Sequence, residues 1–346
     1  MSAIPSHRRP FAGLPDRIGA ADGAGRIRQQ LIDSVFRPAF ANRALDAAHD
    51  GARLSFDDTT FAFTTDSFVV KPLFFPGGTI GDLAVNGTVN DLAMCGARPV
   101  WLSAAFVLEE GLPIGDLQDI VISMRNAAAA ADVEIVTGDT KVVERGKADG
   151  VFITTSGVGV VERGHVAPSR MQAGDAVIVS GDLGRHGIAI LAARKGLSLE
   201  GRVCSDTAPL WPAVRALLDA RLDIHCLRDL TRGGLASALS ELAAAAGVSM
   251  LIDESVLSCT PAVREGCDLL GLDPWGVANE GRFVAIVAAA DAPQALSVLR
   301  REEVSRGAVL AGQVGATHPG EIVIQRRLGG SRVIDLFHAS QLPRIS

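Results

Sequence analysis

The stretch FTTDSFVVKPLFFPGGTIGDLAVNGTVNDLAMCGARP, residues 63–99, decides the fold of the N-terminal half of the chain. Hydrophobic and polar residues alternate over residues 59–70, a pattern that predicts a β-strand. The glycine-containing residues 78–96 then predict a helix, with Gly78 or Thr79 as its N-cap and with glycines that permit close packing. The stretch therefore predicts a strand that leads into a closely packed helix.

A line of polar residues crosses this otherwise apolar helix. Asp82, Asn86 and Asn90 are four residues apart and share one helix face, and Asp91 follows directly. Such side chains are not expected to form a solvated surface. Two interpretations stay open: a ligand-binding site, which we favour, and a set of buried hydrogen bonds between domains or subunits.

Composition narrows the class of protein. The chain has 346 residues, enough for about two domains, and 48% of them are hydrophobic. The net charge of −6 argues against a nucleic-acid-binding surface, and no apolar run reaches the ~18 residues of a membrane span. The five cysteines are odd in number and form no CxxC pair, so we expect reduced thiols and a cytoplasmic protein.

Strand and helix patterns mix in both halves of the chain. This mixture favours the α+β class over one continuous parallel sheet. A new unit of turn, strand, glycine-rich turn and helix begins near Met171, and His186 in its SGDLGRHG segment is expected at a turn. The expected divisions are a disordered extension 1–17, a domain 18–165, a second domain 166–338 and a C-terminal tail 339–346.

Acidic residues recur where predicted strands end and turns begin. A single aspartate at a turn is usually a cap, but several of these lie among Gly, Ala, Val and Thr without a charged neighbour. Buried carboxylates need a partner, and a hard cation such as Mg²⁺ beside nucleotide phosphates would supply one. The residues are Asp50, Asp66, Asp82, Asp91, Asp139 and Asp229.

Two further charged residues are candidates with two interpretations each. Lys141 follows Asp139 by two residues, on the same side of a strand, and would suit a phosphate unless it is an exposed strand lysine. Glu280, in ANEGRFVAIV, is either a turn residue or a general base on a strand end. Neither the P-loop pattern GxxxxGK[ST] nor the dinucleotide pattern GxGxxG occurs.

Taken in order, these segments resemble the HypE family of hydrogenase maturation proteins. The segments are the opening stretch, VTGDTKVVERGKADG, DLTRGGLA, ANEG and the final QLPRIS, and the likeness runs from about Ile18 to Ser346. HypE proteins are carbamoyl dehydratases of the PurM-like superfamily. The resemblance implies an N-terminal ATP-binding domain that dimerises, a C-terminal α/β domain and a flexible tail.

The resemblance also implies an activity. A HypF-type enzyme places a carbamoyl group on a C-terminal cysteine, and ATP-dependent dehydration turns it into a thiocyanate. The cyano group then passes to iron on a HypC–HypD-type complex. The implied partners are a second copy of the chain, a HypF-like carbamoyltransferase and a HypC–HypD-like scaffold, without nucleic acid or membrane. The implied ligands are ATP and Mg²⁺.

The family's functional positions can be placed on this sequence. The implied metal ligands are Asp50, Asp66, Asp91 and Asp229. Catalysis falls to Glu280 as a base, to Lys141 of GDTK and to position 346. The residues expected at the nucleotide are Asp66, Asp91, Asp139, Lys141, Asn90, Gly23 and Gly25.

Three positions depart from the family pattern. The glycine loop is Asp22–Arg26, DGAGR, and an Asp-Asp pair is replaced by His49-Asp50. The terminal cysteine is replaced by Ser346, whose hydroxyl is a poorer nucleophile than a thiolate, so we expect impaired cyano transfer. The alternatives are a non-catalytic assembly partner and another PurM-like ATP-dependent kinase or ligase acting on a small molecule.

Overall fold

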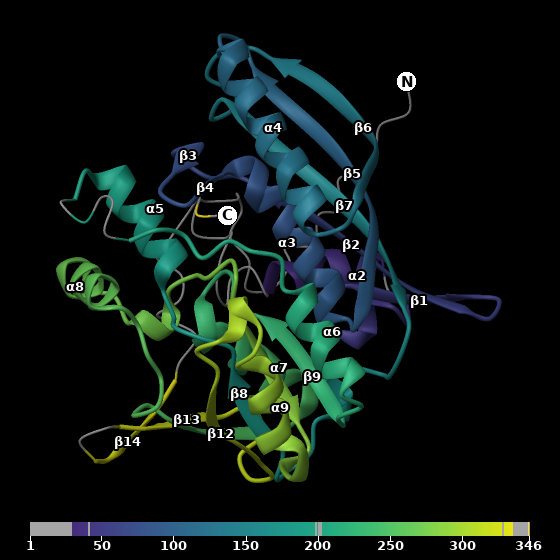
Figure 1. Ribbon diagram of the computed structural model, residues 1–346, viewed down its shortest axis with the longest axis vertical. Helices are drawn as coiled ribbons and strands as arrows, with labels where there is room; N and C mark the ends of the chain where they lie inside the picture. Colours follow the sequence, from purple (N-terminus) through teal and green to yellow (C-terminus); the bar gives the residue numbers. More distant parts are fainter. Residues whose placement is uncertain are drawn as a thin grey trace, which may run out of the picture.

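The computed structural model describes residues 30–40, 42–197, 199, 203–326, 329–334 and 345. Two sheets dominate these residues, and each is accompanied by helices (Figure 1). Strands and helices alternate without a continuous parallel sheet, which confirms the predicted α+β class. The predicted domain limits near residues 165 and 338 stay predictions.

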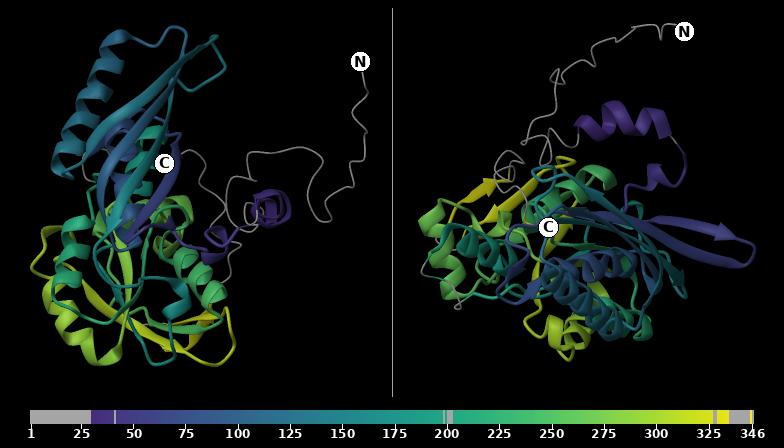
Figure 2. Two further views of the ribbon diagram at one scale, coloured as in Figure 1. Left: turned by 90° about the vertical axis from the view of Figure 1, so that its right-hand side faces the viewer. Right: turned by 90° about the horizontal axis from the view of Figure 1, so that it is seen from above.

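The first sheet contains five strands in the order β1-β2-β7-β5-β6. Neighbouring strands are antiparallel except β5 and β6, which are parallel and joined by the helix α4 (Ile114–Ala130). The β1–β2 hairpin projects beyond the rest of the sheet (Figure 2). The strands are β1 (Ala52–Phe56), β2 (Thr59–Phe68), β5 (Ala97–Glu109), β6 (Glu134–Val143) and β7 (Val151–Val161).

The helix α3 (Ile80–Met94) packs against the first sheet and also contacts β9 and α6 of the second unit. The Thr79 hydroxyl accepts the amide hydrogens of Gly81 and Asp82, and the Asp82 carboxylate accepts that of Thr79, so a capping box starts the helix. A side chain at Gly81 would lie 2.5 Å from the carbonyl of Ile120 on α4, which explains the glycine. The predicted N-cap and close packing are both confirmed. Two short strands, β3 (Phe74–Phe75) and β4 (Gly78–Thr79), precede α3.

The second sheet contains seven strands in the order β14-β13-β10-β12-β8-β11-β9. Its strands are β8 (Ala176–Val179), β9 (Ile224–Asp229), β10 (Ser249–Asp253), β11 (Phe283–Val287), β12 (Val309–Gly315), β13 (Ile322–Gln325) and β14 (Ser331–Val333). The helices of this unit are α5 (Arg185–Lys195), α6 (Trp211–Asp219), α7 (Gly234–Ala246), α8 (Pro261–Leu270) and α9 (Ala292–Leu299).

The interior strand β8 is buried on both faces. Val177 and Val179 belong to the core shared with α7, whereas Ala176 and Ile178 belong to the core shared with α6 and α9. Two-sided cover explains a continuous apolar strand instead of an alternating one. Ala93, at the end of α3, belongs to the same core as α6, so the two units share buried surface.

Some elements differ from the sequence predictions. The helix expected within residues 18–46 is helical at 30–40, with a π-helical turn at Ile32–Phe36 followed by α2 (Arg37–Phe40). Sequence patterns did not predict β1, α6, α8 and β12. Among the described residues, no helix combines the length and apolar character needed to cross a membrane.

Candidate active site

A polar pocket of about 240 Å³ lies between the two units, where α3 approaches the end of β9. Acidic side chains outnumber basic ones in its lining. Such an excess of negative charge in a partly closed space favours a cationic ligand, because the repulsion needs compensation. The charged lining residues are Asp50, Asp66, Asp91, Arg228, Asp229, Arg232, Glu241 and Glu280.

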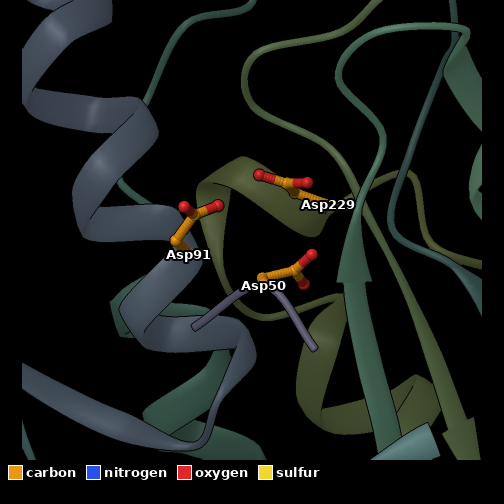
Figure 3. Close-up of side chains that lie close together, drawn as sticks. All are labelled: Asp50, Asp91 and Asp229. Atoms are coloured by element: carbon orange, nitrogen blue, oxygen red, sulfur yellow. The ribbon is translucent and has the colours of Figure 1, made fainter. Parts of the chain in front are cut away.

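Three carboxylates converge at the centre of this pocket. Asp91 comes from α3, Asp229 ends β9, and Asp50 precedes β1 (Figure 3). One oxygen of each lies within 4.8 Å of the other two. Residues far apart in the sequence thus supply three hard oxygen atoms at one point. Carboxylate oxygens are the ligands that Mg²⁺ prefers in proteins.

Hydrogen bonds hold these carboxylates without satisfying them fully. The Thr64 hydroxyl donates to Asp91 Oδ2 at 2.7 Å, and the Arg228 guanidinium donates to Asp50 Oδ1. Asp50 Oδ2 is buried and has no hydrogen-bond partner among the described residues. An acceptor left open in a fixed, buried position fits a bound cation.

Burial and mutual repulsion set the protonation of this cluster. Burial, followed by the charges of Asp229 and Asp50, raises the pKa of Asp91 well above its ordinary value. The pKa of Asp229 is raised in the same way, by burial and then by Asp50. Burial also raises the pKa of Asp50, although the charge of Arg228 opposes the shift. A divalent cation would favour the ionised form of all three, so the donor set fits Mg²⁺.

Glu280 enters the same pocket from the segment before β11. The amides of Glu280 and Gly281 donate to the two carboxylate oxygens of Asp206, each at 3.2 Å. A side chain at Gly281 would lie 1.9 Å from the Asp206 carbonyl oxygen, so only glycine permits this approach. The Asn279 side chain accepts the amide hydrogen of Gly184 at 2.7 Å. Asn279, Glu280 and Gly281 thus each make a different contact that explains the residue type at that position.

The environment of Glu280 suits a proton acceptor. Its Oε1 is buried without a hydrogen-bond partner among the described residues. Burial, followed by the negative charges of Asp229 and Asp206, raises the pKa of Glu280 well above its ordinary value. A carboxylate in such a place is a stronger base than one in water.

Similarity to known proteins agrees with this geometry. Residues 48–161 match the N-terminal domain of AIR synthase related proteins, and residues 172–325 match the C-terminal domain. Over 322 residues, 93% of this chain and 94% of the relative, the sequence is 48% identical to the carbamoyl dehydratase HypE of Azotobacter vinelandii. The chain belongs to the HypE family.

Solved HypE structures extend the match to three dimensions. A crystal structure of a HypE–HypF complex has a TM-score of 0.83 and 43% identity, over 88% of this chain and 99% of that one. A HypE crystal structure in complex with ATP has a TM-score of 0.81 and 44% identity, over 93% and 97% of the two chains.

One departure from the HypE pattern lies at the edge of the acidic cluster. His49 Nδ1 accepts the amide hydrogen of Asp50 at 2.8 Å and lies 3.7 Å from Cys95 Sγ. Burial, then the charge of Arg228, lowers the pKa of His49 to about 3, so the ring is neutral. Where an aspartate was expected, this chain therefore carries no charge.

The polar face of α3 divides between structure and site. Asp82 belongs to the capping box, and Asn86 donates to the Thr207 hydroxyl at 3.2 Å. Asn90 donates to the carbonyl oxygens of Ala208 and Glu280 and accepts the amide hydrogen of Leu210. These contacts correspond to the alternative of buried hydrogen bonds between units. The nucleotide-binding role of Asn90 stays a prediction, and its side chain does not line the acidic pocket.

The remaining predicted residues fall in three places. Asp66, on β2, lines the acidic pocket. Asp139 and Lys141 do not line it: they form an exposed ion pair of 2.6 Å on β6. Gly23, Gly25 and Ser346 lie outside the described residues.

Sequence reasoning missed two residues. Arg228, the partner of Asp50, directly precedes Asp229 in RDLTRGG, but a pocket arginine and a surface arginine have the same appearance in a sequence. His186 was expected at a turn, which is wrong: it is fully buried in the first turn of α5. Burial depends on tertiary packing, and no local pattern signals it here.

Proposed function

We propose that the chain is an ATP-dependent carbamoyl dehydratase of the kind that makes the cyano ligand of [NiFe]-hydrogenase iron, with delivery of the cyano group impaired by Ser346. The observation that carries the proposal is the cluster of Asp50, Asp91 and Asp229 in the acidic pocket, beside Glu280. Its support is the identity to a relative named carbamoyl dehydratase and the likeness to HypE bound to ATP.

The proposed chemistry removes water from a primary carboxamide. In HypE proteins the carboxamide is bonded to a cysteine sulfur at the chain's end. Its oxygen attacks the γ-phosphorus of ATP while one nitrogen proton is lost, which gives ADP and a phosphate ester. Loss of phosphate and of the second nitrogen proton then gives a thiocyanate, so atoms and charges balance.

The residues of the pocket have distinct roles in this proposal. Asp50, Asp91 and Asp229, with Asp66 beside them, would hold Mg²⁺, which supplies positive charge to the phosphates when bound. Glu280 accepts the nitrogen proton lost in the first step, since its unpartnered oxygen faces a buried space, and the leaving phosphate takes up the second proton. Outside the pocket, Asp139 and Lys141 would contact the phosphates together with Gly23 and Gly25, which lie outside the described residues.

Lys141 must reach the reaction from the exposed strand β6, which points to a homodimer. The hydrophobic side chains of Val136 and Val142 are 58% and 71% exposed on this edge strand, and a partner sheet would cover them. The further partners are a HypF-like carbamoyltransferase, as in the HypE–HypF complex, and a HypC–HypD-like acceptor.

Position 346 decides whether this chain completes the reaction. A carbamoyl group on the Ser346 oxygen would give a cyanate ester instead of a thiocyanate, and the hydroxyl is a weaker nucleophile than a thiolate. We therefore expect nucleotide and partner binding to remain while cyano transfer is lost.

The test is Ser346→Cys, incubated with a HypF-type carbamoyltransferase, carbamoyl phosphate and ATP, and followed by intact mass. We expect a carbamoyl adduct and then the loss of one water. Ser340→Cys, in the same segment, is the matched control and should stay unmodified. An unmodified Ser346→Cys protein that still binds its partners would instead support the assembly role.

A further inference from the structure

Ile345 is buried in a hydrophobic cluster. Its side chain is 2% exposed and belongs to the buried cluster that includes Phe75, Ile190 and Ala278. Its carbonyl oxygen lies 2.5 Å from Nε2 of His186. The chain beside its last residue is thus fixed by one buried side chain and one buried hydrogen bond.

The hydrogen bonds around His186 fix which ring nitrogen donates. The carbonyl of Ile345 can only accept, so Nε2 carries the hydrogen. Nδ1 then accepts from the Ser205 hydroxyl at 2.8 Å, while the Ser205 oxygen accepts the amide hydrogen of Thr207 at 3.1 Å. Burial lowers the pKa of His186, which agrees with a neutral ring. The hydrogen bond from Ser205 therefore fixes the orientation of the His186 ring independently of its contact with Ile345.

The same segment also holds the proposed base. Asp206, next to Ser205, accepts the amide hydrogens of Glu280 and Gly281. On the other side, the amide of Gly187 donates to the carbonyl of Ala278 at 3.0 Å. The neighbours Ser205 and Asp206 thus bind His186 and Glu280 respectively, and the bond between Gly187 and Ala278 holds the two segments together a second time.

We propose that His186 is a positioning residue, which docks the chain at Ile345 and, through Ser205 and Asp206, aligns the docked end with Glu280. The docking rests on the contacts alone, whereas its meaning for catalysis rests on the proposed function. Among the described residues, His186 contacts neither the acidic cluster nor the Asp139–Lys141 pair, so its role is separate from theirs.

The first experiment measures how well the chain's end is protected. The full-length protein is treated with carboxypeptidase, and intact mass follows the loss of residues 346 and 345. We expect His186→Ala to be trimmed about 5–10 times faster than wild type, since one buried hydrogen bond is lost. Ile345→Ser should be trimmed more than ~10 times faster, because the buried apolar contacts of the isoleucine side chain are then lost.

Conservative variants separate positioning from a general packing role. His186→Gln keeps an N–H donor and should restore most of the protection that His186→Ala loses. Ser205→Ala should act through His186, so adding it to His186→Ala should change little further. His165→Ala removes an exposed histidine and serves as the control.

Two outcomes would overturn the proposal. One is wild-type trimming of both His186→Ala and Ile345→Ser. The other is full additivity of the His186 and Ser205 variants. Calorimetric titration with Mg-ATP is made on the same proteins and should not differ between wild type and His186→Ala. Absence of ATP binding to wild type would contradict the proposed function and leave the trimming result unaffected.

A catalytic readout completes the test. In the Ser346→Cys background, His186→Ala should lower the rate of water loss from the carbamoylated C-terminal tail, and His186→Gln should restore that rate. Unchanged dehydration in His186→Ala would refute the alignment with Glu280 even if docking were weakened.

Discussion

The acidic pocket and the edge strand β6 contain the same kinds of residue in opposite environments. In the pocket, Asp91 and Asp229 are held close together, and their pKa values are raised by burial. On β6, Asp139 forms an exposed pair with Lys141, and hydrogen bonds from Lys141 and from the amide of Thr140 lower the pKa of Asp139. One region holds unbalanced charge, and the other has its charge already neutralised.

The difference shows what a folded chain alone provides. Unbalanced charge in a pocket creates affinity for a cation before any ligand arrives, whereas an exposed ion pair contributes little. The β6 pair therefore becomes functional only where another surface covers it. The experiments below separate the two regions, beginning with the largest expected effect.

The greatest contrast is expected in nucleotide affinity. Asp91→Asn removes one oxygen charge from the cluster and should weaken Mg-ATP binding at least ~100-fold, since a removed ligand costs at least as much as a lost outer-shell contact. Asp139→Asn, the matched change on β6, should have a much smaller effect. Isothermal titration measures both, and equal losses would contradict the division into two regions.

Turnover should reveal whether β6 serves a partner's pocket. In the Ser346→Cys background, Glu280→Gln and Lys141→Met should each slow dehydration ~100-fold, the scale of a lost proton-transfer or electrostatic group. Mixed dimers of the two variants contain one site with both residues intact if Lys141 acts across the interface. We then expect about half the wild-type rate per mixed dimer. No recovery would place Lys141 and Glu280 in the same subunit's reaction.

Asn90 tests the boundary between pocket and scaffold. Asn90→Ala leaves the carbonyls of Ala208 and Glu280 and the amide of Leu210 without their partner. Unpaired buried groups should lower the free energy of unfolding by about 1–3 kcal/mol. Chemical denaturation measures this change, for which Asn126→Ala on the exposed face of α4 is the control. A loss of ATP binding without destabilisation would favour the nucleotide-binding role instead.

The smallest expected effect is the pH dependence of stabilisation by Mg²⁺. Between the ordinary carboxyl pKa of about 3.9 and the raised values of Asp91 and Asp229, the folded state holds protons that the unfolded state has lost. Without metal, stability should therefore fall as pH rises through this window.

Mg²⁺ binds the ionised carboxylates, so the increase in Tm on adding it should be larger at about pH 8 than at about pH 6. The difference should be a few degrees, and thermal melts at both pH values measure it. Asp91→Asn should be more stable than wild type without metal and should lose the pH-dependent gain. A gain that is constant with pH would exclude these carboxylates as the ligands.

Much of this arrangement could be predicted from the sequence because local signals carried it. The strand and helix of residues 59–96, the capping residue Thr79 and the mixed fold follow from alternation, capping and composition. The clustering of aspartates suggested a shared site. Spacing, however, could not show that Asp82 caps a helix while Asp91, on the same helix, enters the pocket.

The rest depended on contacts between distant segments. Asn90 is satisfied by residues more than a hundred positions away, and His186 meets Ile345 across 159 positions. Arg228 is a pocket residue because the segment before β1 is brought beside β9. No local sequence pattern encodes such long-range contacts, so the roles of these residues become visible only in the folded structure.

The shared core at the end of α3 has a consequence for how the chain comes apart. Ala93 and Met94 share a buried core with Leu210 and Val214 of the second unit, and the described hydrogen-bond partners of the Asn90 side chain all lie in that unit. Neither half therefore has a finished interior by itself. A chain cut in the exposed segment around Arg163 should yield two fragments that are insoluble alone and reassemble when produced together.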